Sequence, residues 1–378
     1  MIKIGQRTVN VAAAEPCAEV EGWSAARGCE HGAVAITTQR AESLLAGPMA
    51  LLAVIPWMLY RPLVRARNLL FDWGLRRQRQ AGVPVVSIGN ISLGGTGKTP
   101  LVALVCAELA ALGHQPQVLS RGYKGDGQGN DEAAMLDWPV VCDPQRIRGA
   151  KRARAAGASC LVLDDGFQHR QIHRNLDIVA IDATRPWGRS DGRRGRTVPL
   201  GLLREHPSAL SRANLLVLTR CDQVSEQRRD KLLSLLAKLG TGGTPVVCCA
   251  HAPSALCHLN GEKAGTPEDL AGQSVVAACG IGNPNAFTRT LRDLGAEIVA
   301  EHHFADHHHF TSAQCQALIA ATPADALVLI TAKDAVKWRA LISGAEAERV
   351  RVLEVSAQMP ADDLAVLRRQ LQALAPKA

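Results

Sequence analysis

The chain has 378 residues, of which 47% are apolar and 21% charged, so it is neither intrinsically disordered nor a bundle of membrane spans, and it is long enough for two domains. Only 3% of the residues are aromatic, which argues against a stacking platform for single-stranded nucleic acid. The net charge of +8 favours an anionic partner, whether a phosphate compound, a nucleic acid or a membrane surface. The 11 cysteines include no C-x-x-C pair, which excludes a zinc ribbon or thioredoxin motif and indicates a reduced, cytosolic protein.

The first 80 residues differ in character from the rest of the chain. Residues 1–40 show no periodicity and are expected to form an extension. Residues 44–60 are apolar but are interrupted by Pro48 and Pro56, and residues 61–80 carry six arginines. Apolar residues recur there at helical spacing, namely Leu59, Leu63, Ala66, Leu70 and Trp73.

This pattern is typical of a helix that lies in a membrane interface. Two alternatives stay open, a helix packed on the protein's own core and a true membrane span. We expect residues 41–82 to form a membrane-associated helical segment, with contacts from residues 44–80.

A nucleotide-binding loop follows. The β-branched run at 83–90 leads into G-G-T-G-K-T and then into an apolar helix expected at 98–112, which is the context of a P-loop. Lys98 would contact the β- and γ-phosphates, and Thr99 would bind Mg²⁺. The expected nucleotide contacts are Ser92, Leu93, Gly94, Gly95, Thr96, Gly97, Lys98 and Thr99. Because Arg220 replaces the lysine of the guanine motif in Thr219-Arg220-Cys221-Asp222, ATP is the expected nucleotide.

Two aspartates end the apolar run at 159–165. A carboxylate at the end of a strand beside a P-loop is the usual Mg²⁺ ligand of this class. Since neighbouring side chains alternate between faces, at most one of the two points straight at the metal. We expect Asp164 to bind Mg²⁺ and Asp165 to act in catalysis, although the pattern leaves the order open.

Seven motifs together resemble one family. They are S-I-G-N-I-S-L-G-G-T-G-K-T-P (87–100), L-S-R-G-Y (119–123), G-N-D-E-A (129–133), L-D-D-G-F-Q-H-R (163–170), L-G-L-L-R-E (200–205), F-A-D-H-H-H-F (304–310) and T-A-K-D-A-V-K (331–337). In this order they resemble the tetraacyldisaccharide 4′-kinases, the lipid A kinases of Gram-negative envelopes. The resemblance implies ATP- and Mg²⁺-dependent phosphorylation of the 4′-hydroxyl of a lipid-linked glucosamine disaccharide 1-phosphate. It also implies a peripheral position on the cytoplasmic face of the inner membrane, with neither nucleic acid nor an obligate protein partner.

The same resemblance implies further site residues. Asp131 and His307 would deprotonate the sugar hydroxyl, although G-N-D-E-A contains one residue more than the family's G-D-E-P. Lys98 and Asp165 complete the catalytic set, and Glu205 would lie at Mg²⁺ with Thr99 and Asp164. The expected substrate contacts are Arg121, Tyr123, Glu132, His169 and Arg204.

Two further segments, one rich in histidine and one rich in arginine, each allow more than one interpretation. The five histidines of 302–310 could indicate a metal site or a solvated loop around one catalytic imidazole. The arginine-rich loop 185–196 could bind the substrate's 1-phosphate or lipid headgroups, or be a solvated basic loop.

Alternating strands and helices predict the architecture. Strands are expected at 84–89, 116–120, 140–142, 160–164, 177–182, 214–219 and 245–248, and helices at 98–112, 223–239 and 284–294. This is the pattern of a P-loop NTPase-like, doubly wound α/β fold with a mainly parallel sheet. A polar break at 262–274 separates a P-loop kinase domain (83–265) from a second, smaller α/β domain (270–378). The competing functions are a nucleotide-driven switch and a basic nucleic-acid-binding ATPase.

Overall fold

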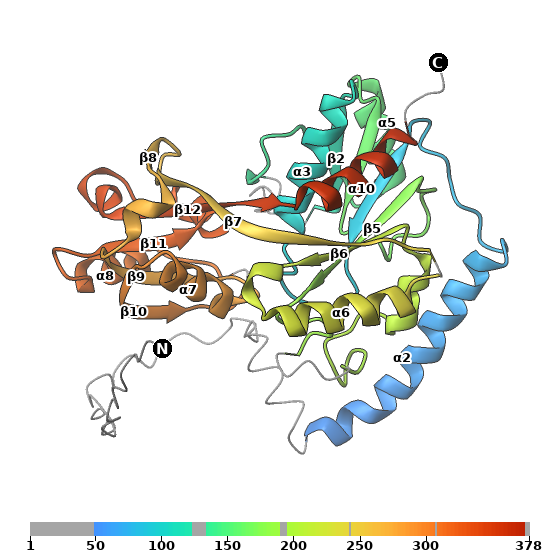
Figure 1. Cartoon of the computed structure of the whole chain (residues 1–378), viewed down its shortest axis with the longest axis horizontal. Helices are drawn as coiled ribbons and strands as arrows, with labels where there is room; N and C mark the ends of the chain where they lie inside the picture. Colours follow the sequence, from blue (N-terminus) through green and yellow to red (C-terminus); the bar gives the residue numbers. More distant parts are fainter. Residues whose placement is uncertain (1–48, 123–133, 190–194, 242, 307, 375–378) are drawn as a thin grey trace, which may run out of the picture. The chain divides into compact units, whose positions relative to one another are not determined.

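We describe a computed structural model that covers residues 49–122, 134–189, 195–241, 243–306 and 308–374. Its strands form one mixed sheet in the order β10-β9-β11-β12-β7-β6-β5-β1-β4-β2-β3, and β8 pairs with β7 (Figure 1). The P-loop half of the sheet is parallel throughout, from β3 to β7. This confirms the expected α/β fold with a mainly parallel sheet.

The expected strands of the P-loop half are present with small shifts at their ends. They are β1 (Val85–Gly89), β2 (Pro116–Ser120), β3 (Val140–Cys142), β4 (Cys160–Asp164), β5 (Leu176–Asp182) and β6 (Leu215–Thr219). The helices α3 (Lys98–Ala111), α6 (Glu226–Leu239) and α7 (Pro284–Asp293) also occur where the apolar periodicity predicted them. Full burial of β1, β4, β5 and β6 explains why their sequences are continuous apolar runs.

The strand expected at 245–248 is wrong in its extent. β7 runs from Val246 to His258 and pairs antiparallel with β12 (Val350–Gln358) along most of its length. The sequence did not indicate the full length of this strand, because it contains many small residues and Pro253. Pro253 lies where the register of β12 against β7 shifts, and such irregularities are positions at which a strand tolerates proline.

The second group of strands follows the predicted strand–helix–strand scheme. It contains β8 (Lys263–Gly265), β9 (Ser274–Cys279), β10 (Glu297–His303) and β11 (Leu327–Thr331), with α8 (Ser312–Ala321) and α9 (Ala332–Trp338). β9, β10, β11 and β12 pair in parallel. The boundary between domains 83–265 and 270–378 stays a prediction, because β7 and β12 continue the sheet from one group of strands into the other.

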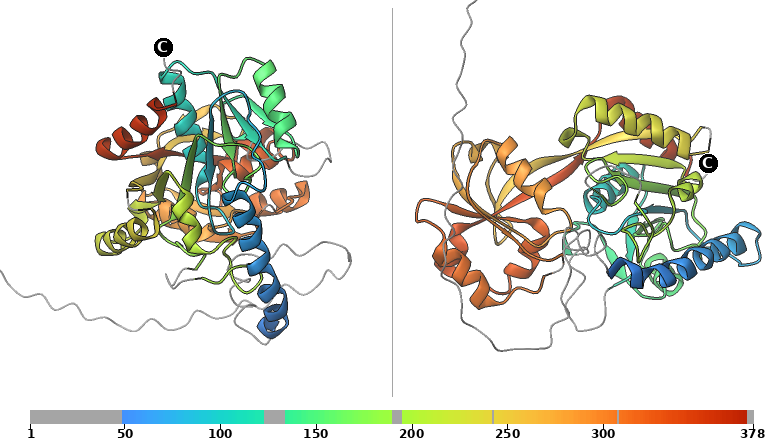
Figure 2. Two further views of the ribbon diagram at one scale, coloured as in Figure 1. Left: turned by 90° about the vertical axis from the view of Figure 1, so that its right-hand side faces the viewer. Right: turned by 90° about the horizontal axis from the view of Figure 1, so that it is seen from below.

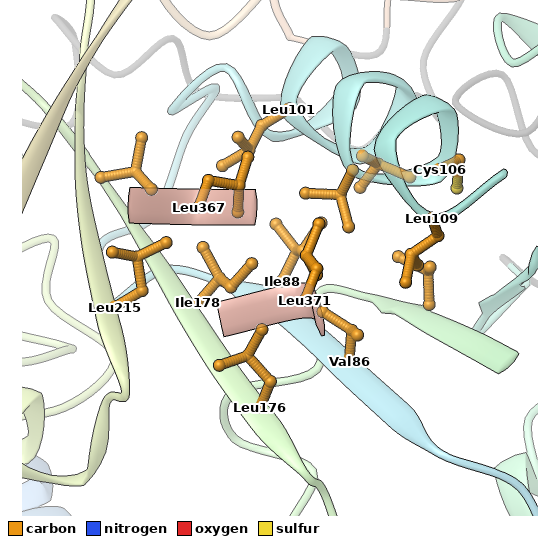
Figure 3. Close-up of a cluster of buried hydrophobic side chains, with 14 of the residues drawn as sticks. Val86, Ile88, Leu101, Cys106, Leu109, Leu176, Ile178, Leu215, Leu367 and Leu371 are labelled. Carbon is orange, nitrogen blue, oxygen red and sulfur yellow. The ribbon is translucent and has the colours of Figure 1, made fainter. Parts of the chain in front are cut away.

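The main core lies between the P-loop half of the sheet and two helices. α3 contributes Leu101, Cys106 and Leu109, and α10 (Ala361–Gln372) contributes Leu367 and Leu371 (Figure 3). These side chains meet Val86, Ile88, Leu176, Ile178 and Leu215 of the strands. A second core forms on the opposite face, where α6 packs (Figure 1). Two helices were not predicted from the sequence, α10 and α5 (Arg146–Ala155); the buried apolar residues of α5 are alanines.

Helix α2 (Met49–Asp72) lies along the P-loop half of the molecule (Figure 2). It continues through Pro56 and Pro62, which both lie on its exposed side, so the expected interruption at Pro56 is wrong. Among the described residues, no helix is both long and apolar enough to cross a membrane.

The predicted apolar stripe of α2 faces away from the protein. Leu59 is 61% exposed, Leu63 68% and Trp73 68%. The side that packs inward is the other one, where Trp57 donates to Thr197 Oγ1 (3.0 Å) and Tyr60 donates to the Arg204 carbonyl (2.9 Å). The stripe therefore does not pack on the protein's own core.

Candidate active site

The P-loop connects the end of β1 to the start of α3. Gly94 and Gly97 have φ values of 96° and 73°, a left-handed region that a side chain would strain. Gly97 is the N-cap of α3, so the first N–H groups of that helix are free of intrahelical partners and open toward the loop. This backbone is suited to bind an anion before any ligand arrives.

Buried side chains hold the loop in this shape. Asn90 Nδ2 donates to Thr96 Oγ1 (2.8 Å), and Thr219 Oγ1, at the end of β6, donates to the Thr96 carbonyl (2.9 Å). Arg220 Nη1 donates to the Gly95 carbonyl (3.1 Å) and pairs with Asp182. Asp182 and Arg220 are both less than a tenth exposed. This buried pair connects the P-loop to the end of β5, where Asp182 lies.

Lys98, Asp165 and Arg204 form the charged centre of the site. Lys98 Nζ lies 3.4 Å from Asp165 Oδ1, and Arg204 Nη1 donates to Asp165 Oδ2 over 2.6 Å. Burial alone would raise the pKa of Asp165, but the charges of Lys98 and Arg204 outweigh it and lower this pKa to about 2. Asp165 is therefore ionised at neutral pH, and the centre carries one more positive charge than negative.

Local backbone pairing brings Arg204 to this place. Leu93 N donates to the Leu202 carbonyl and Arg204 N to the Ile91 carbonyl, both over 2.7 Å. The segment after the arginine-rich loop therefore runs beside the entrance of the P-loop. On the other side of this contact, β4 ends at Asp164. Asp165 follows with a φ of 52°, which turns the chain sharply at the residue whose carboxylate meets Arg204.

A cleft of about 390 Å³ opens above this centre. Leu93 to Thr99, Asp165 and Arg204 line one side, and Gly282, Asp306 and Lys333 of the second group of strands line the other. Lys333 Nζ pairs with Asp306 (2.8 Å). Gly282 approaches the P-loop so closely that a Cβ there would lie 2.5 Å from the Gly95 nitrogen. The G-I-G-N turn at 280–283 is thus part of the cleft.

His169 lies in a second, strongly basic pocket, also of about 390 Å³. Burial, followed by the charges of Arg146, Arg174, Arg67 and Arg121, lowers the pKa of His169 to about 4, so the imidazole is neutral. Arg146 is 4% exposed and donates through Nη2 to the Asp164 carbonyl (2.8 Å), while its Nη1 has no hydrogen-bond partner among the described residues. Such a pocket attracts anions.

Several expected site residues lie elsewhere. Asp164 is buried at the end of β4 and Ser92 beneath the P-loop, so neither lines the cleft. Glu205 is buried on the α2 side, where it pairs with Arg212 (2.9 Å) and accepts from Asn68 (2.8 Å). Neither Asp164 nor Glu205 lines the cleft, and their expected Mg²⁺ roles stay predictions. Arg121 is exposed after β2. Tyr123, Asp131, Glu132 and His307 lie outside the described residues.

The arginine-rich and histidine-rich segments also have specific contacts. Arg185 donates to the Gly282 carbonyl (3.4 Å), so this arginine holds the cleft side of the second strand group. The ring of His308 stacks on Phe304 at 4.9 Å. No group of three or more metal-ligating side chains occurs in the part of the chain that the structure describes.

Sequence reasoning missed the supports of the P-loop. Asn283 Nδ2 donates to Asp182 Oδ2 (3.3 Å), which links the G-I-G-N turn to the pair of Asp182 and Arg220. The one available signal was Arg220 itself, whose departure from the guanine motif was read only as evidence on the nucleotide. His251 also lines the cleft and gave no signal in the sequence. Burial, followed by the charge of Arg220, lowers the pKa of His251 to about 3.

The donor set is suited to Mg²⁺. The Thr99 hydroxyl and the Asp165 carboxylate both line the cleft beside Lys98, and hard oxygen donors of this kind are what Mg²⁺ prefers. The ion usually takes only one or two carboxylates and completes its shell with phosphates and water, so a larger cluster is not required.

Comparison with known proteins agrees with this geometry. The model of the family described as tetraacyldisaccharide-1-P 4′-kinase (LpxK) matches residues 49–374. A tetraacyldisaccharide 4′-kinase of Anaeromyxobacter dehalogenans (strain 2CP-C) is 40% identical over 342 residues, which are 83% of this chain and 89% of that protein. One from Anaeromyxobacter sp. (strain Fw109-5) is 42% identical over 303 residues, 74% of this chain and 80% of that protein.

A solved structure points the same way. The crystal structure of LpxK from Aquifex aeolicus in complex with ATP is 25% identical, with a TM-score of 0.65, and the match covers 88% of this chain and 99% of that one. The chain therefore belongs to the tetraacyldisaccharide-1-P 4′-kinase family.

Proposed function

We propose that this protein transfers the γ-phosphate of ATP to the 4′-hydroxyl of a tetraacyl glucosamine disaccharide 1-phosphate, a step of lipid A biosynthesis. The observation that carries the proposal is the contact of Lys98 and Arg204 with Asp165 at the mouth of a preformed P-loop, in a chain that belongs to this kinase family. Phosphoryl transfer depends mainly on positioning and on charge stabilisation, and this centre can supply both.

The roles of the charged residues follow from their positions. The N–H groups of Gly94 to Thr99 bind the phosphates, and Lys98 neutralises charge that develops on the transferred group. Asp165 and Thr99 would hold Mg²⁺, which supplies further charge neutralisation when bound. Arg204 then has two tasks, since it orients Asp165 before the nucleotide binds and faces the phosphates afterwards.

We also propose Asp131 and His307 as the groups that remove the proton of the sugar hydroxyl. Support comes from their neighbours in sequence, because Met135 and Asp306 line the cleft. Since the two sides of the cleft come from the domains proposed at 83–265 and 270–378, closure on the substrate would bring acid and base groups together.

The basic pocket around His169 supports a phosphorylated acceptor. Several arginines surround a neutral imidazole there, and Arg121 adds its charge from the end of β2. We infer that Arg121 and His169 contact the acceptor on this side, with Tyr123 and Glu132 from the neighbouring segment. Arg204 lines the neighbouring cleft above the P-loop.

We propose further that α2 rests on the cytoplasmic face of the inner membrane through residues 44–80. Its outward stripe is apolar, and arginines 61, 65, 76 and 77 border it, which is the composition of an interfacial helix. The double variant L59E/L63E should lower the fraction of protein that sediments with anionic vesicles. V299E is a matched control, because Val299 is 50% exposed on β10. Equal sedimentation of both variants would reject the interfacial helix.

The activity is tested by incubating the full chain with labelled ATP and a lipid-linked disaccharide monophosphate, alongside reactions with DNA or with no acceptor. We expect label on the lipid, and a loss of at least about a hundredfold in turnover for K98A at unchanged circular dichroism, because one transition-state charge contact is removed. ATP hydrolysis without label on the lipid would favour a nucleotide-driven switch instead, and stimulation by DNA alone would favour a nucleic-acid ATPase.

A further inference from the structure

Two thiols lie together directly beneath the nucleotide site and take no part in phosphoryl transfer. Cys221 follows Arg220, which holds the Gly95 carbonyl of the P-loop, and Cys248 lies in β7. We propose that Cys221 and Cys248 form a reversible disulfide when the protein meets a peroxide. This proposal goes beyond the kinase function and does not depend on it.

The strand register brings the two thiols together. β6 and β7 pair in parallel with Leu218 opposite Cys248. After β6 the chain turns back, because Arg220 has a φ of 55°, and the Sγ of Cys221 lies 2.7 Å from the carbonyl oxygen of Leu218. Cys221 is thus beside the strand neighbour of Leu218, and the side chains of Cys221 and Cys248 pack in the same apolar cluster.

The alternation of side chains selects Cys248 over its neighbour Cys249. Successive residues of a strand point to opposite faces of the sheet. Cys221 and Cys248 both belong to the apolar cluster on the α6 side, whereas Cys249 belongs to the cluster on the α3 and α10 side. The sheet therefore separates Cys221 from the side chain of Cys249, so of these two adjacent cysteines Cys248 is the one that Cys221 can reach without a change of fold.

The two thiols differ in a way that suits a reactive and a resolving cysteine. Cys248 is partly exposed, whereas Cys221 is only 8% exposed. Interaction with the neighbouring Cys221 thiol lowers the pKa of Cys248, and interaction with Cys248 together with burial raises the pKa of Cys221. An accessible thiol of lowered pKa beside a second thiol is the usual arrangement of an oxidant-sensitive pair.

The chemistry balances with hydrogen peroxide as the oxidant. The Cys248 thiolate attacks one peroxide oxygen, an S–O bond forms, the O–O bond breaks, and the hydroxide released takes up a proton to become water. The Cys221 sulfur then attacks the sulfenic sulfur, an S–S bond forms, the S–O bond breaks, and the second water leaves with the thiol proton. Two thiols and one peroxide thus yield one disulfide and two waters, and an added dithiol reverses the change.

The consequence is a covalent tie at the base of the nucleotide site. The short helix Cys221–Gln223 would be bound to β7, beside Arg220 and beside Gln223, which lines the cleft. A cross-link that matches the native geometry restricts the unfolded chain and raises stability. We therefore expect the oxidised protein to unfold at a higher urea concentration than the reduced protein.

The test uses the purified full chain, reduced and then desalted, with hydrogen peroxide as the probe. Remaining thiols are alkylated, and peptides are identified by mass spectrometry. We expect one main cross-linked pair, Cys221 with Cys248, that disappears after treatment with dithiothreitol. In C221S, dimedone should label Cys248 as a sulfenic acid, because the resolving thiol is gone.

C249S is the matched control, since it changes the adjacent thiol on the other face, and it should keep the cross-link in full. A cross-link to Cys249, a stable sulfenic acid at Cys248 in the wild type, or no oxidation of either residue would overturn the proposal. A urea midpoint that falls on oxidation would also overturn it, because the bond would then require distortion of the native fold. Urea unfolding of each reduced variant confirms that it is folded before oxidation.

Discussion

The buried pair of Arg220 and Asp182 offers a quantitative test of how the P-loop is supported. Asp182 is 3% exposed and Arg220 8%, and the arginine also donates to the Gly95 carbonyl. Burial alone would raise the pKa of Asp182, but Arg220 and the hydrogen bonds from Thr184 and Asn283 outweigh it and lower the pKa. The carboxylate is therefore charged, and within the described part of the chain Arg220 is the cation that pairs with it.

The R220M variant keeps the bulk of the side chain and removes the charge. Asp182 retains its hydrogen bonds from Thr184 and Asn283, but a charge without a counterion stays buried, which costs about 3–5 kcal/mol of the free energy of unfolding. The Gly95 carbonyl also loses a donor, worth about 0.5–1.5 kcal/mol, so the Kd for ADP should rise roughly two- to twelvefold.

The assays are urea unfolding at neutral pH and calorimetric titration with Mg²⁺ and ADP. R368M is the matched control, because Arg368 pairs with Glu108 at the surface and its side chain is 53% exposed. A surface pair of this kind contributes less than about 1 kcal/mol. The double variant R220M/D182N should recover part of the loss, since it removes the uncompensated charge. Equal destabilisation of R220M and R368M would refute the reasoning.

Two further predictions concern the buried histidines and the closest approach of the two sides of the cleft. The pKa values of His169 and His251 lie at about 4 and about 3, below the value of about 6.5 in an unfolded chain, so the unfolded state binds more protons in between. The free energy of unfolding should therefore rise with pH across this range and level off above about pH 7, and H251Q should flatten the rise; a urea series that shows stability falling with pH would contradict this. G282A places a methyl group 2.5 Å from the Gly95 nitrogen, so turnover and ADP affinity should both fall while circular dichroism stays unchanged, and a fully active G282A would show that the cleft does not need this contact.

The local features of the P-loop half could be predicted because each depends on neighbouring residues. A buried parallel strand is a continuous apolar run, and Gly94 and Gly97 are required by the turn itself, whatever surrounds it. The family resemblance could be stated for the same reason, since its motifs are contiguous segments.

Contacts between residues that are not adjacent in the sequence decide what the motifs left open. The family resemblance places Glu205 at the metal, and this stays a prediction; in the structure Glu205 accepts from Asn68 and pairs with Arg212. Asp164 and Asp165 could not be told apart until the backbone turn showed which one faces Lys98. β7 stayed hidden because pairing with β12, rather than its own apolar pattern, makes it a long strand.

The sequence by itself determined the nucleotide loop, the parallel strands around it and the apolar stripe of α2, because propensity, periodicity and glycine geometry act over a few residues. Only the tertiary structure decided that this stripe points outward, that Asp165 rather than Asp164 meets Lys98, and that Arg220 and Asp182 hold the P-loop. Side-chain orientation and charge compensation depend on which segments meet in space, and in this fold hydrogen-bonded side chains come from segments separated by as many as 260 residues along the chain.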